Sequence, residues 1–269
     1  MIKHIFKTDN THERDKNLVF DEEPHKYYIN DNKTNDYTSV TTWIHSHFEP
    51  FNANIIIDKM MQSKKWEKSE YFGMTKEEIK TQWKENGRKA AEDGTNMHQH
   101  IEDFYNNKEV NDDTKEFGFF MKFHSDLEDL EPYRTEWMVY DEELKIAGSI
   151  DMLYKNKNGN LDIYDWKRCK NIKKENPWQN SITKCIKHIP DTNFWHYSLQ
   201  LNIYKNILER NYDVKVDDLY IVCMHPNQET YIKMKIPNLQ QELDSLFKER
   251  IEILELDNLE NDIEVFMFI

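Results

Sequence analysis

The stretch IAGSIDMLYKNKNGNLDIYDWK, residues 146–167, constrains the fold of this chain more than any other segment. Two apolar runs flank a turn rich in Asn and Gly, a pattern typical of two antiparallel strands. Asp151 lies in the first run, and Asp165 and Lys167 lie at the end of the second. Burying charged side chains is costly unless they have partners. The hairpin is therefore expected to bring these charges together, and a divalent metal ion would suit two converging carboxylates.

The register of this hairpin decides whether the charges meet. Asp165 and Lys167 are two residues apart, so a strand projects both from one face and Trp166 from the other. A two-residue turn at 158–159 would place Asp151 opposite Trp166, and the two aspartates would then face opposite sides of the sheet. We therefore predict a connecting loop of odd length, three or five residues, or a β-bulge.

Other residues are candidates for the same site. Glu136 lies on an expected strand, in TEWMVYDEE, where it is either a metal ligand or water-activating group or an ordinary solvent-facing glutamate. His98 and Glu102 share one helical face, so His98 could complete a metal shell or contact phosphate; a surface His–Glu pair is the alternative. Gly148 leaves little bulk beside Asp151, which would let a phosphate approach closely.

Two aspartates of the hairpin have structural alternatives. Asp151 could be a buried aspartate that accepts hydrogen bonds from backbone amides rather than a ligand. Asp162 lies near the start of its strand, where a solvated turn residue is the better interpretation. A structural calcium site is a further alternative, but it needs more oxygen ligands than these residues supply.

The net charge of −14 argues by itself against a nucleic-acid partner. The charge is uneven, however, because residues 166–189 contain seven Lys or Arg residues and one acid, Glu175. Phosphate binding depends on such local patches, although a solvated basic loop is the alternative. The patch directly follows Asp165 and Lys167, and its candidate phosphate-binding residues are Arg168, Lys170, Lys173 and Lys174.

The three cysteines, Cys169, Cys185 and Cys223, form no CxxC pair. Their number and spacing predict a reducing compartment and argue against a zinc finger and a four-cysteine iron–sulfur cluster. The sequence begins without a signal-peptide apolar region, and no apolar run approaches the ~20 residues of a membrane span. We therefore expect a soluble intracellular protein, located in the cytoplasm, the nucleus or a viral replication site, with no membrane partner.

Hydrophobic periodicity predicts a helical N-terminal half followed by a β-β-β-α-β-β-α half. Strands are expected at 18–30, around Tyr37, and at 133–141, 146–155, 161–167, 218–225 and 229–236. Helices are expected at 39–48, 52–68, 75–92, 95–105, 114–130, 193–210 and 238–256, with a polar connection at 168–192. This order predicts an α/β fold with a mixed central sheet flanked by helices. We expect residues 1–92 to form a mainly helical region that caps a core formed by residues 93–269.

Taken in chain order, these residues resemble the RecB-like branch of the PD-(D/E)xK nuclease superfamily over residues 90 to 255. The matching motifs are G-T-x-x-H, a strand glutamate, G-x-x-D, D-x-K and Q-x-x-x-Y, formed here by Gly94, Thr95, His98, Glu136, Gly148, Asp151, Asp165, Trp166, Lys167, Gln200 and Tyr204. The resemblance implies a restriction-endonuclease-like core that binds one or two Mg²⁺ or Mn²⁺ ions. It implies metal ligation by His98, Asp151, Asp165 and the Trp166 carbonyl, with Lys167 serving the attacking water.

The same resemblance implies that Gln200 and Tyr204 support DNA contact and that the activity is a DNA exonuclease. Such an enzyme would act on ends or single strands in replication, recombination or repair. No P-loop is present, so the chain would act alone or beside a partner such as a helicase or recombination factor. Trp178, Phe194 or Trp195 could stack on bases, with core packing as the alternative. The alternative functions are a structure-specific or restriction-type endonuclease and a catalytically silent nucleic-acid-binding protein.

Overall fold

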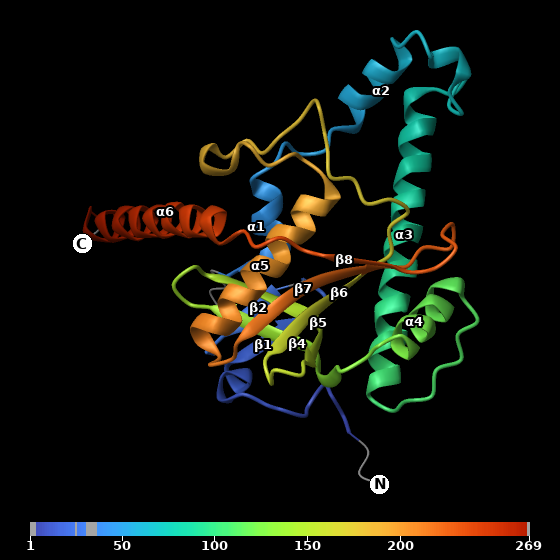
Figure 1. Cartoon of the computed structure of the whole chain (residues 1–269). Helices are drawn as coiled ribbons and strands as arrows, with labels where there is room; N and C mark the ends of the chain where they lie inside the picture. The colour runs from blue at the N-terminus through green and yellow to red at the C-terminus, as the bar shows by residue number, and fades with distance from the viewer. Residues whose placement is uncertain (1–3, 25, 31–36, 268–269) are drawn as a thin grey trace.

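The computed structural model describes residues 4–24, 26–30 and 37–267, and its centre is a six-stranded mixed sheet flanked by helices (Figure 1). This confirms the α/β class with a mixed central sheet. The six strands of this sheet are β3 (Thr38–Ser39), β4 (Glu131–Asp141), β5 (Ile146–Lys155), β6 (Leu161–Lys167), β7 (Val216–Cys223) and β8 (Ile232–Lys235). The bounds of β5 and β6 are those expected from the sequence, whereas β8 is shorter than its expected range.

Strand β5 lies inside the sheet. It pairs antiparallel with β4 along one side, and with β6 along its C-terminal half on the other. The two residues of β3 pair parallel with the start of β5. On its other side, β6 pairs in parallel with β7, and helix α5 (Asn193–Asn211) lies in the crossover connection between these two strands. Strand β7 then pairs antiparallel with β8. The end of β6 is therefore held between two strands and leads directly into the long connection 168–192.

The N-terminal region is not clearly the mainly helical cap expected for residues 1–92. It contains a short 3₁₀ helix η1 (Glu13–Asn17), a hairpin of β1 (Leu18–Asp21) and β2 (Lys26–Ile29), and strand β3 of the central sheet. Residue 25 of the expected strand region 18–30 lies outside the described residues. Helix α1 (Val40–Ser46) packs against α5. Helix α2 (Ala53–Met61) and η2 (Trp66–Lys68) divide the segment expected as one helix over 52–68.

The two helices expected at 75–92 and 95–105 form one helix, α3 (Lys76–Tyr105). It begins at the expected capping box, in which Thr75 and Glu78 bond each other's backbone. A glycine such as Gly94 inside a helix costs about 1 kcal/mol, which does not end a helix that packing supports. Met97 and Ile101 supply that packing, since both are buried. Gly94 and Thr95 therefore lie inside α3, and the expected boundary at 92/93 falls within this helix.

Both faces of the sheet are covered. One core joins the sheet to α1, α5 and α6 (Gln240–Met267), and it includes Leu161 and Ile163 of β6. A second, aromatic core joins the other face to α3 and α4 (Lys115–Ser125), and it includes Tyr164 and Trp166. Side chains of β6 thus alternate between the two cores, which confirms that Trp166 and Asp165 point to opposite faces of the sheet. Within the described residues, no helix combines the length and the apolar character that a membrane span requires.

Candidate metal centre

The loop between β5 and β6 has five residues, Asn156 to Asn160, which confirms the prediction of an odd-length connection. The N–H of Asn156 donates to the carbonyl of Asn160 at 2.9 Å, and Gly159 adopts a positive φ of 82° that suits a tight turn. The register pairs Met152 with Tyr164 and Tyr154 with Asp162. Continued one step beyond the paired residues, this register places Asp151 opposite Asp165 on the same face of the sheet, and the charge of Asp151 acts on Asp165.

A third acid extends this row. Strand β4 pairs Thr135 with Met152 and Trp137 with Ile150, so Glu136 lies beside Asp151. Glu136 has a φ of 45°, in the left-handed region that residues other than glycine rarely adopt. Such a backbone costs about 1–3 kcal/mol and is often found at functional sites. Glu136, Asp151 and Asp165 thus form what we call the acid row, which crosses three neighbouring strands.

Helix α3 adds His98 to this row. Its Nδ1 atom lies 3.5 Å from Asp151 Oδ2, and one ligand atom from each of His98, Glu136 and Asp151 lies within 4.8 Å of the others. The Trp166 N–H donates to Asp151 Oδ2 at 2.8 Å, so the backbone amide expected for a structural aspartate is present as well. Ser149 Oγ donates to Glu136 Oε2 at 2.9 Å.

Asp165 and Lys167 form an ion pair in which Lys167 Nζ lies 2.5 Å from Asp165 Oδ2. The ammonium is the donor nearest to this buried carboxylate oxygen, and both side chains are largely shielded from solvent. Lys167 Nζ also lies 4.8 Å from the ring centroid of Tyr197 on α5. The clustered carboxylate oxygens of Glu136 and Asp151, beside the His98 imidazole, suit Mg²⁺ or Mn²⁺.

Burial and mutual repulsion shift the pKa values of the acid row. Burial, and then the charge of Asp151, raise the pKa of Glu136 to about 8. Burial raises the pKa of Asp165 to about 6, although Lys167 opposes this shift, and burial also raises the pKa of Asp151. Burial and then Lys167 lower the pKa of His98, which favours the neutral form that binds metals.

Lys167 supplies the balancing charge. Burial disfavours its ammonium, but the carboxylates of Asp165 and Asp151 outweigh burial and raise its pKa. One lysine balances only part of the charge of three buried carboxylates. A divalent cation would offset the remaining repulsion between them. Among the described residues, His98, Glu136 and Asp151 have ligand atoms close enough to share one cation, and Lys167 places a positively charged donor beside Asp165.

The predicted residues of α5 lie beside the site but differ in exposure. Tyr204 is 3% exposed, and its ring fills the space beside Gly148. A Cβ atom at position 148 would lie 2.6 Å from Tyr204 Oη, so the expectation that this glycine admits a phosphate is wrong. Gln200 Nε2 donates to Tyr204 Oη at 3.4 Å. The half-buried Gln200 and Tyr197 line a small cavity of about 140 Å³ between α1 and α5.

We predict that Gly148→Ala destabilises the fold because its methyl group overlaps the Tyr204 ring. Overpacking of this kind costs about 1–3 kcal/mol, and thermal unfolding should show a lower Tm. Gly118→Ala is the matched control, since a Cβ there meets nothing within 4 Å and alanine favours the helix. An unchanged Tm for Gly148→Ala would show that the contact with Tyr204 is not tight.

The basic candidates separate into two groups. Arg168 is already paired, with Nε 2.7 Å from Glu116 Oε1 and a terminal nitrogen 3.0 Å from Asp93. It thereby holds the start of the connection against α3 and α4. Lys170, Lys173 and Lys174 are exposed and are the candidates that remain open to phosphate.

The aromatic candidates also separate. Phe194 is 3% exposed, and Trp195 packs against the core while its indole donates to the Lys174 carbonyl at 2.9 Å. The alternative of core packing therefore describes both side chains. Trp178 is 88% exposed and stays available to a ligand.

Three contributors were missed by sequence reasoning. Ser149 had a signal, because it is two residues before Asp151 and so shares its face of β5. A weaker indication existed for Tyr197, which lies three residues before Gln200 on α5 and so near the same face of this helix. Nothing in the local sequence indicated Lys7, because its 2.7 Å ion pair with Glu102 joins segments far apart in the chain. The charges of both Lys7 and Glu102 act on Glu136.

Asp162 corrects a further expectation. It is buried rather than a solvated turn residue, and it accepts hydrogen bonds from Asn156 Nδ2 at 2.9 Å and from the Asp218 N–H at 3.2 Å. Alternation along β6 places it on the face opposite Asp165. This aspartate therefore stabilises the hairpin loop and does not belong to the acid row.

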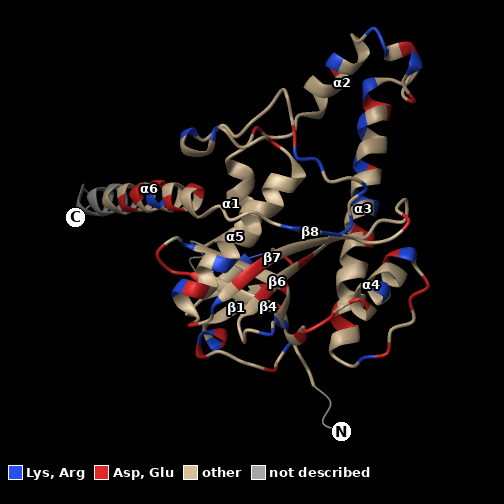
Figure 2. Cartoon of the chain, viewed as in Figure 1, with Lys and Arg blue, Asp and Glu red and all other residues tan. Residues whose placement is uncertain are grey.

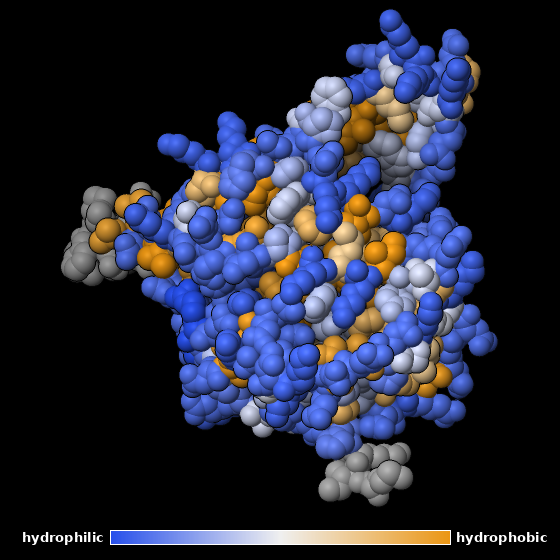
Figure 3. All heavy atoms as spheres, viewed as in Figure 1, coloured by the Kyte–Doolittle hydropathy of each residue, from blue (hydrophilic) through white to orange (hydrophobic). Residues whose placement is uncertain are grey.

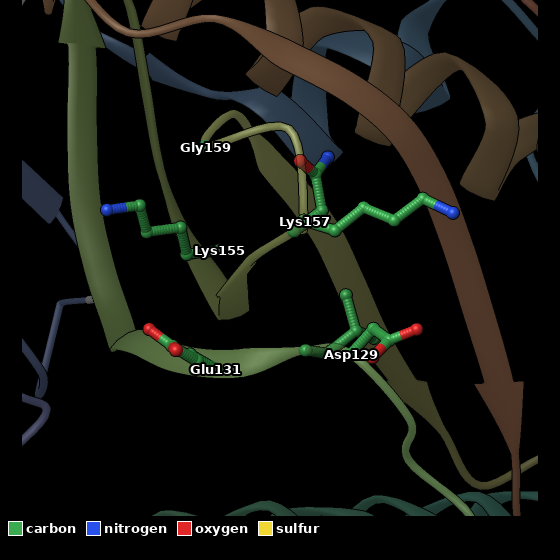
Figure 4. A pocket seen from close by; sticks show the side chains of 7 residues that line it. Asp129, Glu131, Lys155, Lys157 and Gly159 are labelled. Atoms are coloured by element: carbon green, nitrogen blue, oxygen red, sulfur yellow. The ribbon is translucent and has the colours of Figure 1, made fainter.

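A separate cavity lies at this hairpin loop (Figure 4). It has a volume of about 470 Å³ and mixes acidic and basic groups, its lining residues being Asp129, Leu130, Glu131, Lys155, Asn156, Lys157 and Gly159. Lys155 is four residues from Asp151 along β5, or roughly 13 Å. None of the predicted site residues lines this cavity, so it is distinct from the acid row.

Comparisons with known proteins give little further guidance. No protein-family model matches this chain, and no curated protein does. A crystal structure from Eubacterium rectale, provisionally named an exonuclease, matches with a TM-score of 0.34 and 16% identity, over 79% of this chain and 70% of that one. The structure of SSO0001 matches with a TM-score of 0.26 and 17% identity, over 52% of this chain and 57% of that one. TM-scores this low do not establish a common fold. Fold and site together define an α/β protein with a candidate metal centre on its central sheet.

Proposed function

We propose that this chain is a Mg²⁺- or Mn²⁺-dependent deoxyribonuclease, related to the RecB-like branch of the PD-(D/E)xK nucleases. One observation carries the proposal. Asp151 and Asp165 share one face of adjacent strands, and the Lys167 ammonium lies 2.5 Å from Asp165. Two carboxylates for a cation and a fixed ammonium beside them are the groups that phosphodiester hydrolysis requires.

In this proposal, Asp151 and Asp165 hold the cation, with His98, the Trp166 carbonyl and Glu136 as further candidates. A bound Mg²⁺ or Mn²⁺ supplies positive charge to the scissile phosphate and promotes ionisation of the attacking water. Lys167 keeps its proton, so it orients the water or stabilises negative charge on the phosphate instead of acting as a base. Glu136 would serve as a ligand or receive a proton from water.

The substrate we propose is DNA at its ends or in single strands, which makes the enzyme an exonuclease of replication, recombination or repair. The exposed lysines of the 168–192 connection support this choice, because they lie immediately after the candidate catalytic lysine. The paired Arg168 would fix that connection in place. A helicase or recombination factor is the kind of protein partner that would supply such ends.

Metal removal tests the proposal most simply. Oligonucleotides labelled at the 5′ or 3′ end should be cleaved in Mg²⁺ or Mn²⁺, and EDTA should abolish cleavage because the acid row then lacks its cation. Circular single-stranded DNA should be spared by an exonuclease, whereas its cleavage would favour the endonuclease alternative. Tight DNA binding without turnover in Mn²⁺ would contradict hydrolysis and favour the silent binding protein.

A further inference from the structure

Trp178 is the most exposed of the large apolar side chains in the described part of the chain, at 88%. Tryptophan usually buries most of its surface because its side chain is large and mostly apolar. Here it lies in the connection 168–192, which begins directly after Lys167. The visible face of the molecule is largely hydrophilic, with apolar residues gathered in patches (Figure 3). The Trp178 indole is therefore open to contact with a ligand.

The turn that carries Trp178 is held by hydrogen bonds. Asn176 Oδ1 accepts from the N–H of Trp178 at 3.1 Å and from that of Gln179 at 3.2 Å. Asn176 Nδ2 donates to the Asp191 carbonyl at 2.8 Å, and the Asp191 N–H donates to the Gln179 carbonyl at 3.0 Å. The indole is thus presented on an ordered backbone, which lowers the entropy cost of binding.

The connection that carries Trp178 is rich in lysine. Five lysines of the connection are exposed, and none forms an ion pair with another described residue: Lys170, Lys173, Lys174, Lys184 and Lys187. Figure 2 shows basic residues along this connection, in a chain whose net charge is −14. Exposed lysines without ion-pair partners, in the same segment as an exposed aromatic ring, favour an anionic ligand with flat apolar faces.

The connection also leads to the acid row. The Lys173 N–H donates to Asn193 Oδ1 at 2.9 Å, at the start of α5. One helical turn later Tyr197 contacts Lys167, and four residues of helix rise about 6 Å. Two nucleotides of a strand, at about 3.4 Å each, cover that rise. A strand bound in the acid row can therefore continue toward Lys173.

We propose that Trp178 is a base-stacking platform for single-stranded DNA. This deepens, and rests on, the proposed nuclease function by making a single strand the preferred substrate class. Bases in a single strand offer open faces to the indole, whereas those inside a duplex are covered by their neighbours. The five lysines bind the phosphates of the same strand.

Binding without cleavage tests the inference. The full-length protein in EDTA is titrated into labelled oligo(dT) of 16 nucleotides and into a 16-base-pair duplex, with fluorescence anisotropy as the readout. Trp178→Ala should weaken oligo(dT) binding by about 5- to 150-fold, the scale of one lost stacking interaction, and change duplex binding less than two-fold. Trp178→Phe should retain part of the affinity.

Trp178→Leu is the matched control because it keeps an apolar side chain but has no aromatic face. It should bind oligo(dT) as weakly as Trp178→Ala; full affinity would mean apolar docking and would overturn the stacking proposal. An oligo(dT) affinity of Trp178→Ala within two-fold of the wild type would also overturn it. These readouts need no catalysis. Trp178-dependent binding by a protein that cleaves nothing would refute the proposed hydrolysis and leave the stacking site standing.

Discussion

Asp165→Asn is expected to lower DNA cleavage by about 100- to 1000-fold, the scale for removing one preorganised electrostatic group from an active site. The substitution keeps the shape of the side chain but removes the charge that would bind the cation. The fold should persist, since Lys167 retains Asp151 and the Tyr197 ring as neighbours. The readouts are cleavage rates of labelled oligonucleotides in Mg²⁺ and the Tm.

Asp162→Asn provides the matched control for this experiment. It changes another buried aspartate of the same strand, but one that faces away from Asp165 and bonds the hairpin loop. Its cleavage rate should stay within a few-fold of the wild type, even if its Tm falls. Asp165→Ala should also lack cleavage, and Mg²⁺-dependent activity retained by purified Asp165→Ala would refute the assignment of the acid row.

Lys167→Met is expected to remove cleavage and, in metal-free buffer, to lower the free energy of unfolding by about 3 kcal/mol. Losing one member of a buried ion pair leaves the other charge uncompensated. Without the lysine, Asp165 keeps a folded-state pKa above its unfolded value, so the loss should be larger at pH 8 than at pH 5, where protonation relieves the charge. Denaturant unfolding at both pH values measures this.

The double variant Asp165→Asn/Lys167→Met separates the structural role of the pair from its catalytic role. Removing both charges leaves no unpaired ion at this position, so much of the stability should return. Cleavage should remain absent, because neither the carboxylate nor the ammonium is restored. A double variant as unstable as Lys167→Met would show that the lysine stabilises the fold through some other contact.

The hairpin that carries Asp151 and Asp165 was predictable because strand alternation and loop parity depend on local sequence. The helix boundary predicted near Gly94 was wrong, because tertiary packing of Met97 and Ile101 lets α3 continue past the glycine. Nor could local pattern place Tyr204 beside Gly148, because that contact depends on how α5 crosses the sheet.

Ion pairs between segments far apart in the chain could not be predicted from local sequence either. A run of basic residues predicts a phosphate-binding patch, but the pairing of Arg168 with Glu116 and Asp93 depends on how α3 and α4 pack. The positive φ of Glu136 is likewise a property of β4 in its sheet. Sequence therefore indicates the candidate side chains, whereas the fold decides which of them are already paired.

The central claim is that the acid row binds a divalent cation, and a crystal soaked in Mn²⁺ tests it most directly. The anomalous difference map should show a peak bounded by carboxylate oxygens of Asp151 and Asp165, with Glu136 or His98 completing the ligands. The Asp165→Asn crystal should lose or weaken that peak. Crystals in millimolar Mn²⁺ with no peak between these two aspartates would contradict the account.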